Sequence, residues 1–113
     1  MPMPGGRLDE STRAILREVR SGLGGIYGVR LREVRLYGSY ARGEAREGSD
    51  MDILVVLDDV KDVGEELSRM SELGSALSLA HDVTISFYPV SEWEFRNRQS
   101  PLLINIRREA ILA

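Results

Sequence analysis

Two aspartates separated by one residue, Asp50 and Asp52, stand where the most apolar run of the chain begins. Residues two apart on a strand point to the same face, so both carboxylates can share one divalent cation. Gly38 and Ser39 form a Gly-Ser pair earlier in the chain. A turn of this kind can bring backbone N–H groups and a hydroxyl close to a phosphate. Together the two pairs predict metal-dependent chemistry on a nucleotide.

The elements that must position these residues follow from the hydrophobic pattern. Residues 51–57 are apolar except for Asp52, which predicts a central strand that is buried on both faces. A carboxylate within such a strand is costly unless a cation, hydrogen bonds or a proton compensates it. Before this strand, residues 33–37 are expected to form another strand, with a bulge or lead-in ahead of it. Residues 39–43 are expected to form a short helix after Gly38, and residues 44–50 a connecting loop.

The remaining elements supply a core around that strand. Apolar residues recur at spacings of three and four in residues 9–25 and 63–80, which is the pattern of amphipathic helices. A further strand is expected at residues 82–90, and its proline indicates a position at the sheet edge. A short helix after Ser91 and a last helix over residues 101–112 complete the chain. The expected fold is α+β, a small mixed β-sheet packed by helices.

Composition limits the classes of function. A chain of 113 residues with a net charge of −3 suits one domain and gives no overall attraction to nucleic acid or to an anionic membrane. Residues 1–8 are expected to be a disordered lead-in, and residues 9–113 a single domain ending in a helical segment. There is no cysteine and no P-loop motif. No run approaches the ~20 apolar residues of a membrane span, so the protein is expected to be cytoplasmic.

The two pairs have a defined spacing: Gly38 and Ser39, ten residues, then Asp50 and Asp52. In this motif, and in the order of the strands and helix around it, the chain resembles the nucleotidyltransferase superfamily that includes DNA polymerase β. It is most similar to the small single-domain branch, the minimal nucleotidyltransferases. The resemblance implies that the aspartates bind two Mg²⁺ ions and that the Gly-Ser turn holds the phosphates of ATP. Such ions stabilise the charge that develops in phosphoryl transfer.

Two further site residues are implied by the resemblance. The family has a third carboxylate on a later strand, and Asp82, at the start of the expected strand, is the candidate for that metal-binding and catalytic position. Its alternative role is that of a turn residue after a helix; Ser86 on the same face cannot replace a carboxylate, and turnover would then be weak or absent. Arg42 is the candidate for pairing with the triphosphate, with a structural salt bridge as the alternative.

The resemblance also implies a partner. Small members of the family are commonly encoded beside a HEPN-type ribonuclease toxin, and they act as type VII antitoxins by transferring AMP from ATP to a toxin tyrosine. Three features fit this function: the sequence GSYARG at residues 38–43, the lack of a substrate domain, and the apolar, Arg-bearing C-terminal segment. Two alternatives are a non-catalytic antitoxin that only binds the toxin and a nucleotidyltransferase acting on a small molecule. A homo- or hetero-oligomer is compatible with each.

Overall fold

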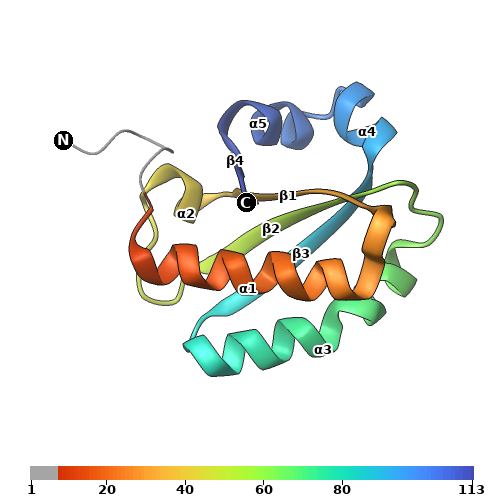
Figure 1. Ribbon diagram of the computed structural model, residues 1–113. Helices are drawn as coiled ribbons and strands as arrows, with labels where there is room; N and C mark the ends of the chain where they lie inside the picture. Colours follow the sequence, from red (N-terminus) through yellow and green to blue (C-terminus); the bar gives the residue numbers. More distant parts are fainter. Residues whose placement is uncertain (1–7) are drawn as a thin grey trace.

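A four-stranded mixed sheet with helices on both faces forms the framework of the chain (Figure 1). The computed structural model describes residues 8–113, so the predicted lead-in lies, apart from Leu8, outside the described residues. The strand order is β3-β2-β1-β4. Strand β1 (Leu31–Tyr37) is antiparallel to β2 (Asp50–Leu57) and to β4 (Ile111–Leu112), whereas β3 (Thr84–Ser91) is parallel to β2. The predicted α+β fold with a small mixed sheet is confirmed.

Two long helices cover one face of the sheet (Figure 1), namely α1 (Glu10–Tyr27) and α3 (Val63–His81). The Asp9 carboxylate caps α1 by accepting a hydrogen bond from the backbone N–H of Thr12 at 2.8 Å. This helix runs two residues past its predicted limit because Tyr27 is buried and its hydroxyl donates to Glu66 Oε1 at 3.0 Å. A short 3-10 turn, η1 (Gly28–Arg30), then leads into β1. No helix among residues 8–113 is long and apolar enough to cross a membrane.

The opposite face of the sheet is covered over only part of its area. Two short helices, α4 (Glu92–Asn97) and α5 (Pro101–Glu109), pack there against the second half of β2 and the end of β3. The buried residues of this smaller cluster are Leu54, Val56, Val90, Phe95, Leu103 and Ile106. Because side chains alternate along a strand, the first residues of β2 on this face lie beyond the cluster. That uncovered area carries the candidate site.

The C-terminal segment corrects one prediction. The last helix ends at Glu109, and the prediction that it reaches residue 112 is wrong. Ile111 and Leu112 form β4 and pair with β1 instead. Ile111 follows the buried Ile106 by five residues, which is not a helical spacing. As a strand residue it packs against the main core, and its pairing covers the otherwise open edge of β1.

The boundaries around the central strand agree with the sequence pattern. Strand β2 lies between β1 and β3, and six of its eight positions are buried residues on both faces. The irregularity predicted before residue 33 is a register shift between Leu31 and Glu33. Pro89 lies in β3, which is an outer strand of the sheet, as predicted. Asp52 therefore has a paired strand on each side, whereas Asp50 is paired only with β3.

Candidate active site

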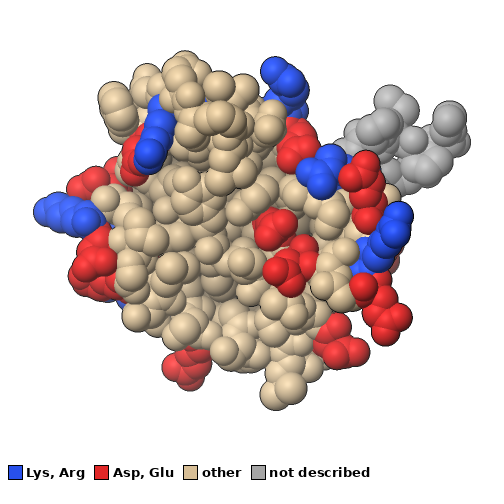
Figure 2. Space-filling view, turned by 180° about the vertical axis from the view of Figure 1, so that it is seen from behind, with Lys and Arg blue, Asp and Glu red and all other residues tan. Residues whose placement is uncertain are grey.

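The two aspartates lie on the uncovered half of the sheet face. Asp50 is exposed and Asp52 is half-buried, and both project from the start of β2 on one side of the sheet. Burial and then the charge of Asp50 raise the pKa of the Asp52 carboxyl. Figure 2 shows the side of the molecule opposite α1 and α3, where two acidic side chains stand in a largely uncharged centre. Such a pair of oxygen donors fits a divalent cation, whose charge would offset the repulsion between them.

The Gly-Ser turn lies directly against this pair. Gly38 has φ 77° and ψ −155°, a backbone conformation open in practice only to glycine. A Cβ atom at this position would overlap the Asp52 carboxylate. Ser39 begins the short helix α2 (Ser39–Arg42), and no side chain caps its first turn. Backbone N–H groups in a first helical turn have no partner within the helix, so they remain free to bind phosphate oxygens.

The neighbouring strands place hydroxyl groups beside the aspartates. On one side Tyr37 of β1 pairs with Asp52, and burial, followed by the charge of Asp52, raises the pKa of Tyr37 to about 12. On the other side Thr84 and Ser86 of β3 lie level with Asp50 and Asp52. The sequence pattern alone indicates no site role for Tyr37 or Thr84. The alternation of side chains within a strand predicts which residues share a face, but only the pairing register shows which residues of neighbouring strands lie side by side.

Asp82 lies at the end of helix α3 and not in strand β3. It follows α3 as the C-terminal cap residue with φ 51° and ψ 48°, and β3 begins only at Thr84, so the prediction that Asp82 opens the strand is wrong. Aspartate tolerates this left-handed conformation, which lets the chain leave the helix. Within residues 8–113 no three His, Cys, Asp or Glu side chains are grouped closely enough to hold one metal ion. The structure therefore does not bring Asp82 to the pair.

Comparison with known proteins identifies the family. Residues 15–112 match the family described as the nucleotidyltransferase domain. The chain belongs to this family. Over 76 residues it is 34% identical to the protein adenylyltransferase MntA of Thermococcus cleftensis, which covers 67% of this chain and 75% of that protein. The predicted membership of the nucleotidyltransferases, and with it an enzyme of this class, is confirmed.

Solved structures agree with that assignment. A structure assigned as a minimal nucleotidyltransferase is 31% identical with a TM-score of 0.63, and the match covers 94% of this chain and 96% of that one. A second match lies in a complex of a tri-AMPylated Shewanella oneidensis HEPN toxin with an MNT antitoxin. It has 22% identity and a TM-score of 0.54, and it covers 90% of this chain and 67% of the other. The second match shows the fold alone.

Arg42 of this nucleotidyltransferase has two acidic partners. Its guanidinium donates to Glu44 Oε1 at 2.8 Å and to Glu109 Oε1 at 3.2 Å, and these bonds raise the pKa of Arg42. The structural salt bridge considered as an alternative is therefore present, and it ties α2 to the end of α5. The positive charge of Arg42 still lowers the pKa of Asp52. The charge of Arg42 thus offsets part of the rise in the pKa of Asp52, which stays above its ordinary value.

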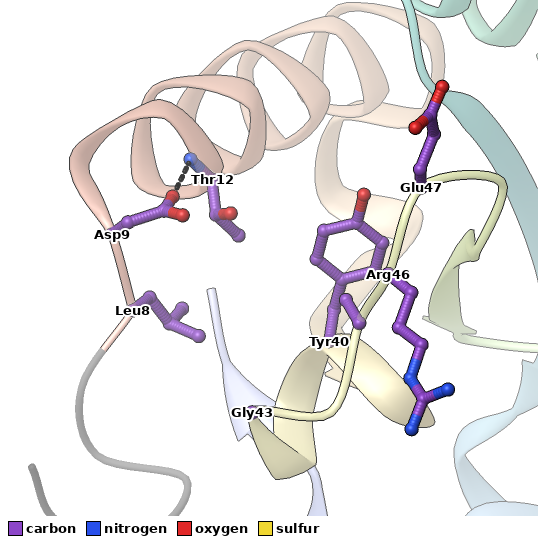
Figure 3. Close-up of a pocket in the computed structure, with 8 residues that line it drawn as sticks. Leu8, Asp9, Thr12, Tyr40, Gly43, Arg46 and Glu47 are labelled. Carbon is purple, nitrogen blue, oxygen red and sulfur yellow. Dashed lines mark hydrogen bonds between the residues drawn. The ribbon is translucent and has the colours of Figure 1, made fainter.

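Two cavities border the region without containing the aspartate pair. One of about 480 Å³ lies between the first turn of α1 and the loop after α2 (Figure 3), lined by Leu8, Asp9, Thr12, Tyr40, Gly43, Ala45, Arg46 and Glu47. In Figure 3 the Tyr40 ring points toward α1, whereas the Arg46 guanidinium points away from it. The other, of about 720 Å³, is lined in part by Ser49, Asp82 and Thr84. Asp82 therefore faces a space next to the strands that carry the site.

Proposed function

We propose that this nucleotidyltransferase transfers AMP from ATP to a hydroxyl group of a protein partner. The observation that carries the proposal is the contact between the Gly38 turn and the Asp50–Asp52 pair. Gly38 lies against the Asp52 carboxylate, so a phosphate held by the turn and a divalent ion held by the aspartates would be neighbours. The similarity to an MntA protein adenylyltransferase supports AMP as the transferred group and protein as the acceptor class.

In the proposed reaction the aspartates and the Gly-Ser turn have separate roles. Asp50 and Asp52 would hold Mg²⁺, as two ions in this proposal, and the bound metal would supply positive charge that offsets the negative charge developing on the phosphates. The backbone N–H groups after Gly38 and the Ser39 hydroxyl hold the β- and γ-phosphates. The acceptor oxygen bonds to the α-phosphorus as the bond from that phosphorus to the pyrophosphate oxygen breaks. Pyrophosphate leaves with the electron pair, and the hydroxyl proton passes to water.

The proposed acceptor is a tyrosine of a HEPN-domain toxin, which makes the protein the antitoxin of the pair. The fold is shared with a chain of a complex in which a HEPN toxin carries three AMP groups. The uncovered half of the sheet face leaves room for an acceptor from another protein to approach the aspartates. Transfer of AMP to a toxin residue would neutralise the toxin by covalent modification.

Arg42 gives a first test of how the triphosphate is held. We expect Arg42→Gln to weaken the apparent affinity for ATP about tenfold, the loss of roughly one charge-assisted contact. The thermal midpoint should change little because its salt bridges are solvent-exposed. Arg98→Gln, which removes an exposed salt bridge to Glu94 on α4, is the matched control. Equal effects of the two substitutions on the KM for ATP would show that Arg42 has only a structural role.

One observation favours a second candidate function, an antitoxin that acts by binding alone. The residues of β3 that lie level with the aspartates carry hydroxyls, and Asp82 does not join them. Growth of cells that express the toxin distinguishes the two functions. We expect the wild-type protein to restore growth and Asp50→Asn, at equal expression, to fail. Recovery with Asp50→Asn would support neutralisation by binding and would count against transfer.

A further inference from the structure

The strand beside the aspartate pair offers hydroxyls where a further metal ligand would be within reach. Ser86 is exposed and lies level with Asp52 in the parallel pairing of β2 with β3. Neighbouring strands are about 4.7–4.9 Å apart, and residues that lie level point to the same face. A carboxylate at position 86 would therefore reach an ion bound to Asp52. A serine there offers only a neutral oxygen.

The other neighbours of Asp52 do not supply a second anionic group. Tyr37, on the opposite side, carries a phenol, which is neutral at pH 7. Gly38 has no side chain, and Asp82 lies at the end of α3. Across residues 8–113 there is no group of three potential metal-binding side chains. Two carboxylates are therefore what the described chain contributes to the ions.

Mg²⁺ is commonly bound by one or two carboxylates together with phosphate oxygens of the substrate. The aspartate pair and the triphosphate meet that need for one ion. A second ion would have to share these two carboxylates, because the β3 residues level with them are Thr84 and Ser86 and add no carboxylate. Its binding should be correspondingly weaker.

We propose that Ser86 sets the metal occupancy of this site, so that the chain with nucleotide holds one divalent ion tightly and the second only weakly. This inference rests on the proposed function, because it assumes that nucleotide and metal bind at the pair. If the second ion binds weakly, the rate of transfer should keep rising at metal concentrations well above those that saturate the first ion. It also identifies Ser86 as the position level with Asp52 at which an aspartate would add a third carboxylate.

The test is a titration with Mn²⁺ in the presence of a non-hydrolysable ATP analogue, with free Mn²⁺ followed by electron paramagnetic resonance. We expect one tightly bound ion per wild-type chain and two for Ser86→Asp. Ser71→Asp places the same charge on the exposed surface of α3, on the other face of the sheet, and should leave the count at one. In transfer assays, Ser86→Asp should lower the half-saturating Mn²⁺ concentration at least about tenfold, equivalent to about 1.4 kcal/mol.

Each other result has a defined meaning. Two ions of similar affinity on the wild-type chain would overturn the inference without any need for a variant, and AMP transfer could still stand. A single tight ion on folded Ser86→Asp, as judged by an unchanged circular dichroism spectrum, would also overturn it. The absence of any nucleotide-dependent Mn²⁺ binding would overturn the proposed function, and the inference with it.

Discussion

Asp52→Asn is expected to abolish AMP transfer, with a loss of at least about 10³-fold in rate, while the fold is retained. The substitution keeps the size of the side chain but removes the charge that, in the proposed function, would hold the cation next to the Gly38 turn. Asp50→Asn should have the same effect because both carboxylates share this task. Asp59→Asn, on the exposed loop after β2, is the matched control and should transfer normally. Substantial transfer by Asp52→Asn would contradict the assignment of the metal site.

The same substitution should not cost stability. In the folded protein the pKa of Asp52 is raised by burial and by Asp50. An aspartate whose pKa is higher when folded than when unfolded favours the folded state at low pH, and that advantage is lost as the pH rises through both values. At pH 7, without added metal or nucleotide, Asp52→Asn should therefore melt at the wild-type temperature or above it. Below about pH 3 the two proteins should converge, since the carboxyl is then protonated in both states.

Gly38→Ala is expected to be the most damaging change in the turn, lowering transfer by at least about 10²-fold, as for loss of a charge-stabilising group. Two effects combine. The backbone at Gly38 occupies a region that costs other residues roughly 1–3 kcal/mol. The added methyl group also overlaps the Asp52 carboxylate, so either the turn or the aspartate has to move. Both movements would disturb the contact between the turn proposed to hold phosphate and the aspartate proposed to hold metal.

Gly43→Ala tests backbone strain without the overlap with Asp52. Gly43 also has a positive φ, of 73°, but a Cβ atom there would meet no atom within 4 Å. This variant should lose stability in thermal denaturation, by roughly 1–2 kcal/mol for the left-handed backbone, and keep most of its transfer rate. Similar losses of transfer in the two variants would mean that strain in α2, rather than the overlap with Asp52, controls activity.

The parts of the site that the sequence predicted are those fixed by local pattern. The apolar run after Asp50 made β2 recognisable as a central strand, and the aspartate spacing determined that both carboxylates share a face. Gly38 could be expected at a tight turn because few other residues adopt its conformation. These features depend on residues close together in the chain, and the structure bears out their placement.

The predictions that failed depend on distant residues. Ile111 and Leu112 pair with β1, and a strand of two residues has no periodicity of its own. The apparent alternation from Asp82 to Ser86 extended the expected strand into what is the cap of α3. Neither the pairing of β3 with β2 nor the contact of Arg42 with Glu109 leaves a signal in local spacing. The family resemblance implied a third carboxylate at Asp82, whereas the residues of β3 that lie level with the aspartates are Thr84 and Ser86.

The most direct test of the central claim is the intact mass of a HEPN-domain toxin, the proposed partner of this chain. It is to be measured after incubation with ATP, Mg²⁺ and the purified nucleotidyltransferase. We expect the mass to increase by one or more AMP units, with the group located on tyrosine by fragmentation, and to stay unchanged when Asp52→Asn replaces the wild type. An unchanged mass with the wild-type protein, while that protein still blocks the toxin, would contradict transfer as the function of the Asp50–Asp52 site.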